Sequence, residues 1–336
     1  MRRVRSLAAA AALLALTLAG VALLTGAAGA VRSAQLPVIA AAALCYSAGF
    51  LVFNAFWAFL LCRLPAGDRP TDNAAVRPAR AWRVGLLSLA GLMTPMNLGT
   101  DVLRSVFGRR YLGLAVPVTA AASVVARECK LHVTLVLLPG AAAFAAIAAT
   151  EARGRLLAAF ASLLVLALAL MAFRSDSAAS LARSLRVGSI AEAARDLHRR
   201  LGWRRRLVIY VAFAAGFAGE WLALRLCFYA LEIPADTVVT LGAFGVLYLL
   251  ARTPVIPFGI GAVEVGGLAW LRLVQVPAGQ AGALIMVWSA LRILVPYVLA
   301  GAALLTFLVE RQGRPQSAEG DAGSPVSTRG GRQAGI

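Results

Sequence analysis

The sequence predicts an all-α polytopic membrane protein. The chain has 336 residues, of which 60% are hydrophobic and 14% charged, and its mean hydropathy is +0.79. Soluble domains of this length are much less apolar. Several apolar runs approach or exceed the roughly 20 residues that an α-helix needs to cross a bilayer. The alternating segments of about 10 residues that mark a transmembrane barrel are absent.

We expect about six full transmembrane helices in one domain, residues 1–309, followed by a disordered polar tail, residues 310–336. The first apolar run, 7–31, follows three arginines and ends near Ala28-Gly29-Ala30, which resembles a signal-peptidase site. Because the run is long for a signal peptide, we favour a retained helix. The other crossings are expected at 36–61, 113–149, 156–173, 207–231 and 280–309.

Two other apolar stretches are interrupted by proline and glycine, and each interruption carries a carboxylate. We call residues 94–104 the first break and residues 256–266 the second break. The apolar arm before the first break, 84–94, is too short to cross a bilayer, so we expect a hairpin that re-enters the face it left. The residues that define the breaks are Pro95, Gly99 and Asp101 in the first, and Pro257, Gly259, Gly261 and Glu264 in the second.

The distribution of basic residues predicts the topology. Most of the 33 lysines and arginines fall in the N-terminal segment, in 63–83, 104–110 and 174–206, and in the tail. The positive-inside rule then places both termini on the cytoplasmic side of the membrane, which we expect to be a bacterial inner membrane. With six crossings, the two hairpins enter from opposite faces. Opposed broken helices are typical of inverted-repeat transporters, whose substrate binds near the bilayer midplane.

Composition argues against several other classes of protein. The net charge is +18, but the basic residues lie in the hydrophilic connections rather than on a nucleic-acid-binding face, so we expect no nucleic-acid partner. The four cysteines and two histidines show no ligand spacing, so we expect neither a metal site nor a cofactor. No phosphate-binding loop is present, which disfavours ATP-driven export by this chain alone.

The first break carries candidate substrate contacts. Proline and glycine leave backbone N–H groups exposed, and helix N-termini attract anions. Arg104 adds a planar, permanently charged group suited to phosphate. Asn97 adds a polar side chain within the same break. Asp101 and Glu264 have two interpretations that remain open: contacts to substrate cations, protons or arginines, or helix caps. For Arg104 the alternative is a side chain that extends to the membrane interface.

Three more cations lie within expected crossings. Charged side chains in the membrane usually face the bundle interior and pair there. Arg127 and Lys130 are candidate substrate contacts, with pairing inside the bundle as the alternative. Arg292 has no acidic residue within a helical turn, so it needs either a tertiary partner or an anionic ligand.

These motifs resemble those of the flippase-like transmembrane domain of lysylphosphatidylglycerol synthases and its stand-alone relatives. The resemblance covers residues 7–308. The first signature, Pro-x-x-x-Gly-(Asp/Glu)-x-x-Arg, is matched by Pro95, Gly99, Asp101 and Arg104. Here one residue, Thr100, is inserted between the glycine and the carboxylate. The second, Pro-x-Gly-x-Gly-x-x-Glu, is matched by Pro257, Gly259, Gly261 and Glu264. A mid-helix Glu-Arg pair stands reversed as Arg127-Glu128, and a final Arg–Pro–Gly pattern matches Arg292, Pro296 and Gly301.

The resemblance implies movement of an anionic phospholipid or a polyprenyl-phosphate-linked lipid between leaflets. Because the chain ends soon after its last expected helix, we do not expect the aminoacyl-transferring domain or synthesis of an aminoacyl lipid. The alternative is a membrane enzyme acting on a lipid-linked sugar or headgroup, with Asp101 and Glu264 as acid and base. A third interpretation is a non-catalytic partner of a membrane enzyme. We favour transport over catalysis, and the oligomeric state stays open.

Overall fold

The computed structural model describes residues 18–22, 25–62, 76–92, 98–147, 188–251 and 259–312. Within these ranges all regular structure is helical, which confirms the predicted fold class. The helices are α2 (Ala28–Arg32), α3 (Leu36–Cys62), α4 (Pro78–Leu87), the 3₁₀ turn η2 (Ser88–Gly91), α5 (Leu98–Leu112), α6 (Val116–Ile147), α8 (Gly188–Arg200), α9 (Trp203–Ala230), α10 (Thr237–Leu250), α11 (Ala262–Leu273) and α12 (Ala278–Gln312).

Three of the described helices are long and apolar enough to cross a membrane. They are Leu36–Cys62, Leu207–Ala230 and Ala278–Glu310, in α3, α9 and α12. Each coincides with a crossing expected from the sequence. The expected crossing at 113–149 is occupied by the 32-residue helix α6, and the one at 156–173 lies outside the described residues.

Helices α3 and α9 make the most extensive helix contact in the described chain. Glycines allow their backbones to approach closely. A Cβ atom at Gly49 would lie 2.9 Å from the carbonyl oxygen of Gly216, and one at Gly216 would lie 2.8 Å from the Phe53 ring. Small residues at helix crossings are typical of membrane bundles, where close backbone packing replaces the hydrophobic effect as the source of association. This pair forms the scaffold against which both hairpins are held.

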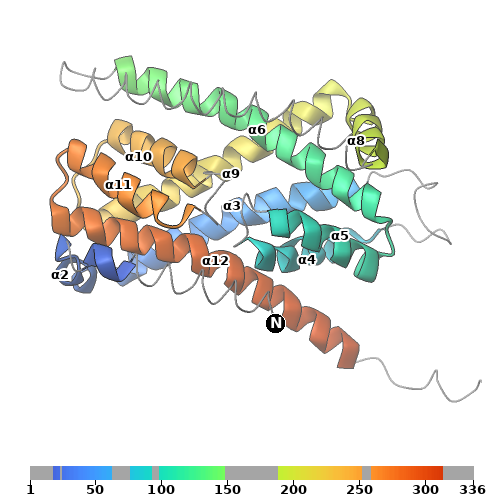
Figure 1. The fold of residues 1–336 in the computed structure, drawn as a ribbon, viewed down its shortest axis with the longest axis horizontal. Coiled ribbons are helices and arrows are strands. Elements are labelled where there is room, and N and C mark those ends of the chain that lie inside the picture. Colours follow the sequence, from blue (N-terminus) through green and yellow to red (C-terminus); the bar gives the residue numbers. More distant parts are fainter. Residues whose placement is uncertain are drawn as a thin grey trace, which may run out of the picture.

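The helices on either side of each break pack against each other: α4 and η2 against α5, and α10 against α11. We call these two groups of helices the first and the second hairpin. The two arms of each hairpin meet at glycine: a Cβ atom at Gly91 would lie 2.3 Å from the carbonyl carbon of Gly99, and one at Gly259 would lie 2.6 Å from the Cα of Ala251. Gly259 also has a φ of 68°, in the region that glycine adopts without steric cost. Figure 1 places the two hairpins toward opposite ends of the long axis, with α12 passing both.

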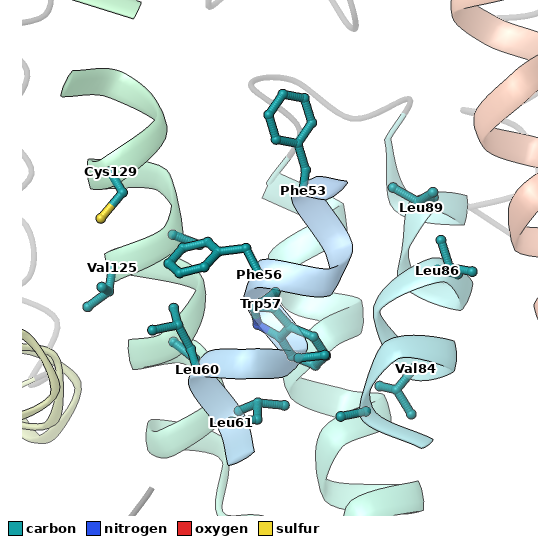
Figure 2. Close-up of a cluster of buried hydrophobic side chains, with 14 of the residues drawn as sticks. Phe53, Phe56, Trp57, Leu60, Leu61, Val84, Leu86, Leu89, Val125 and Cys129 are labelled. Atoms are coloured by element: carbon teal, nitrogen blue, oxygen red, sulfur yellow. The ribbon is translucent and has the colours of Figure 1, made fainter. Parts of the chain in front are cut away.

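The larger apolar core lies beside the first hairpin. Figure 2 shows the α3 side chain of Trp57 between α6, which carries Val125 and Cys129, and α4, which carries Val84 and Leu86. Trp57, Val84 and Val125 are completely buried. The packing of α4 and α6 on either side of α3 thus positions the charged residues of α5 and α6 that are described next.

Four expected boundaries differ from the structure. The first apolar run does not continue as one helix to residue 31, because Gly26 turns the chain with a φ of 64° before α2 begins. The arginine-rich segment 63–83, a hydrophilic connection in the predicted topology, already contains the start of α4. Pro78 occupies the first turn of that helix, where its missing N–H costs nothing. Helix α9 begins at Trp203 rather than at residue 207. Helix α12 extends three residues into the expected tail, to Gln312.

Candidate functional site

Three charged side chains from two helices form what we call the charge cluster: Asp101 and Arg104 of α5, and Arg127 of α6. One carboxylate oxygen of Asp101 pairs with Nε of Arg127, and the other lies 3.6 Å from Nη1 of Arg104. Asp101 and Arg104 are three residues apart, so they share one face of α5. Arg127 therefore pairs across the helix interface, which is the alternative considered for it, and Asp101 has an arginine partner.

Helix α3 supports the guanidinium of Arg104. Nη2 of Arg104 donates to Oδ1 of Asn54 at 3.2 Å, and the guanidinium carbon lies 5.2 Å from the centre of the Trp57 ring. A cation over an aromatic face in a dehydrated site is stabilised by about 2 kcal/mol. Arg104 therefore has a defined orientation, which argues against the alternative that it extends to the membrane interface.

Lys130 lies one turn beyond Arg127 on α6 and contacts two aromatic rings. Its Nζ lies 3.8 Å from the centre of the Phe53 ring on α3 and 5.3 Å from that of Phe217 on α9. The ammonium group is thus placed over apolar side chains of the scaffold rather than in a polar loop. Four elements, α3, α5, α6 and α9, contribute to this region.

The charge cluster contains more positive than negative charge. Arg104 and Arg127 carry +2 against −1 for Asp101, and adding Lys130 and the neighbouring Glu128 leaves the sum at +1. The side chain of Arg104 is 11% exposed, that of Asp101 21% and that of Arg127 39%. The cluster is therefore largely enclosed on the Arg104 side and accessible on the Arg127 side.

Two hydrogen-bond donors at the start of α5 are buried without a partner. They are Oγ1 of Thr100, a residue that is 5% exposed, and Nε of Arg104. A buried donor without an acceptor costs about 1–3 kcal/mol, more when the group is charged. Both lie within a turn of the Asp101 carboxylate, so this region has unused capacity to bind an acceptor such as a phosphate oxygen.

The second hairpin holds its carboxylate differently. Glu264 is fully buried; Oε2 accepts a hydrogen bond from the backbone N–H of Gly261 at 2.6 Å, and Oε1 accepts one from the hydroxyl of Ser289 on α12. Glu264 thus caps the start of α11, which is the structural alternative considered for it. Its hydrogen bond with Ser289 also links α11 to α12. Arg292, which is 3% exposed, lies three residues after Ser289 on the same helix.

The predicted site residues therefore fall into two groups. Asp101, Arg104 and Arg127 come together on the first hairpin, with Lys130 one turn away. Glu264 lies with Gly261 on the second hairpin, against α12. The predicted contact Asn97 and the break residues Pro95 and Pro257 lie outside the described residues. Among the described residues, no group of three or more His, Cys, Asp or Glu side chains is placed to hold a metal ion.

The sequence reasoning missed three residues that hold these groups: Asn54, Trp57 and Ser289. Asn54 and Ser289 stand within long apolar helices, and both are buried, at 1% and 0% exposure. A lone polar residue inside a membrane helix indicates a buried interaction. That signal was available for Asn54 and Ser289, but the identity of their partners was not.

Comparison with known proteins gives one family. The family model described as "Lysylphosphatidylglycerol synthase TM region" matches residues 4–301. No curated protein and no solved structure matches the chain. The family match spans both hairpins, the charge cluster and the contact between Glu264 and α12.

Proposed function

The chain belongs to the family of the lysylphosphatidylglycerol synthase transmembrane region, and from that premise we propose that it moves an anionic lipid between the leaflets of the membrane. The family already links this multi-pass membrane protein to lipid handling. The proposal adds the activity, which is flipping, and a substrate class, which is a phospholipid or polyprenyl lipid with a phosphate headgroup.

The two buried donors beside Asp101, on Thr100 and Arg104, support this proposal most directly. Removing a cation from water costs several kcal/mol, and a counter-ion with good geometry recovers part of that cost. Arg104 and Arg127 share one carboxylate, and the donors of Thr100 and Arg104 have no acceptor. A phosphate brings a negative charge and several acceptor oxygens, and arginine binds it with favourable geometry.

We further propose that the two hairpins are re-entrant and enter from opposite faces of an inner membrane, with both termini in the cytoplasm. In support, the hairpins lie toward opposite ends of the long axis in Figure 1, and α4 and α11 are too short to cross a bilayer on their own. This arrangement resembles that of inverted-repeat transporters. It would allow the charge cluster to contact a headgroup while acyl chains remain in lipid.

The alternative function, a membrane enzyme with Asp101 and Glu264 as acid and base, is less well supported. Asp101 is paired with Arg127, and both oxygens of Glu264 accept hydrogen bonds from within the protein. A general base must reach the proton that it removes, and Glu264 is fully enclosed. Chemical analysis of the lipid after incubation distinguishes the two functions, because a flippase leaves the molecule unchanged.

Reconstitution into vesicles tests the proposal. Phosphatidylcholine vesicles would contain a trace of a lipid that carries a fluorescent label on its hydrocarbon chain. This lipid is phosphatidylglycerol, polyprenyl phosphate or, as the neutral-headgroup comparison, phosphatidylcholine. Dithionite then measures how much label reaches the outer leaflet. We expect one anionic lipid to move and Arg104→Ala to slow it. The matched control is Arg109→Ala, which removes the same charge from an exposed position on the same helix. Equal rates for Arg104→Ala and wild type, or movement of no anionic lipid, would contradict the proposal.

A further inference from the structure

Arg104 is held by α3 in a way that leaves one specific part of its guanidinium for a ligand. Nη2 donates to Asn54, and the guanidinium group lies over the ring of Trp57. Nη1 lies at ion-pair distance from Asp101, and Nε is buried without a hydrogen-bond partner. Nε is therefore a buried guanidinium donor that has no acceptor in the protein.

Hydrogen bonds fix the orientations of the two α3 side chains that contact Arg104. Asn54 and Trp57 are three residues apart and share a face of α3. Nδ2 of Asn54 donates to the carbonyl of Phe50 at 2.9 Å, which orients its Oδ1 toward Arg104. Nε1 of Trp57 donates to the hydroxyl of Ser123 on α6 at 3.1 Å, which sets the plane of the ring.

Helix α4 closes the remaining side of this pair. A Cβ atom at Gly85 would lie 3.0 Å from Oδ1 of Asn54 and 3.2 Å from Cε3 of Trp57. Both side chains are also almost completely buried, at 1% and 0% exposure. Neither can rotate far without a clash, because close-packed interiors transmit such changes.

We propose that Asn54 and Trp57 are positioning residues, which hold the Arg104 guanidinium so that its Nε–H donates to the anionic headgroup. This inference rests on the proposed function. It deepens that function by assigning part of the affinity for the headgroup at this site to two α3 residues that do not touch the lipid. Without them Arg104 keeps its charge but samples several rotamers, and a flexible cation binds a phosphate less well than a fixed one.

The test uses the same vesicles, with fluorescent phosphatidylglycerol varied as a fraction of total lipid. Asn54→Ala should raise the lipid fraction needed for half-maximal flipping by roughly tenfold, since a hydrogen bond to a charged group is lost. The maximal rate should change less. Trp57→Phe keeps an aromatic face and should have a half-maximal fraction close to that of wild type, whereas Trp57→Leu should raise it.

Two controls separate positioning from a general effect on folding. Ser47→Ala removes a hydrogen bond from a side chain of α3 to the carbonyl four residues earlier, as Asn54 makes to Phe50. This variant should behave as wild type. In the Arg104→Ala background, Asn54→Ala should have no further effect on the half-maximal fraction. Thermal unfolding in detergent identifies any variant that fails to fold.

The outcomes distinguish the two proposals. If Arg104→Ala slows flipping while Asn54→Ala and Trp57→Leu flip as wild type, the positioning role is wrong and the proposed function stands. If Asn54→Ala has the same effect with and without Arg104, it acts through general stability, and the positioning role is again wrong. If Arg104→Ala itself leaves flipping unchanged, the proposed function fails, and the positioning role fails with it.

Discussion

The close contact between Gly91 and Gly99 holds the first hairpin together, and Gly91→Ala tests its importance. The added Cβ atom would lie 2.3 Å from the carbonyl carbon of Gly99, 2.4 Å from its oxygen and 2.6 Å from the nitrogen of Thr100. Unbonded carbon atoms pack at about 3.5 Å or more. Because all three atoms belong to the backbone, no side-chain rotation relieves the clash, and η2 and α5 must separate by roughly 1 Å, at about 1–3 kcal/mol.

The same displacement would disrupt the charge cluster. The bond from Arg104 to Asn54 is 3.2 Å long, so a shift of roughly 1 Å would bring it to about 4.2 Å, beyond hydrogen-bond range. We therefore expect Gly91→Ala to lower the unfolding temperature in detergent and to reduce flipping of fluorescent phosphatidylglycerol to a similar extent as Arg104→Ala.

Gly301→Ala is the matched control. It also adds a methyl group to a glycine of the bundle, but nothing lies within 4 Å of the new atom. Alanine is favoured over glycine within a helix by about 0.5–1 kcal/mol, so this variant should be as stable as wild type or slightly more so. If Gly91→Ala unfolds at the wild-type temperature and flips lipid at the wild-type rate, the tight hairpin contact does not position the cluster.

Three other substitutions have expected outcomes. Ser289→Ala removes a donor from the buried Glu264 carboxylate and should cost about 1–3 kcal/mol, seen as earlier thermal unfolding; an unchanged midpoint would count against the link between α11 and α12. Asp236→Ala removes the side chain that caps α10 and should cost about 1 kcal/mol; the same unfolding experiment measures it, and no loss would mean that the cap is redundant. Glu310→Gln weakens the exposed pair with Arg83 and should change stability by less than about 1 kcal/mol; a larger loss would show that this pair fastens α4 to α12.

The locations of helices and breaks were accessible from the sequence because they depend on local properties. Membrane-spanning length and hydropathy marked α3, α9 and α12, and proline with glycine marked both breaks. The helix starts at Pro78 and Trp203 were missed, because the predictions placed helices where the residues are apolar. The first turns of α4 and α9 are rich in arginine and therefore polar. The turn at Gly26 was missed because its flanking residues are as apolar as a helix interior.

The partners of the charged residues were decided only by the tertiary structure. Asn54 and Arg104 are 50 residues apart, and Glu264 and Ser289 are 25 apart; no local pattern relates such positions. Each pairing exists because the helices pack closely enough for buried polar groups to meet, and in a medium without water such groups are stable only when they do. The sequence by itself thus determined where charge enters the membrane, and the packing of the helices determined which side chains hold that charge.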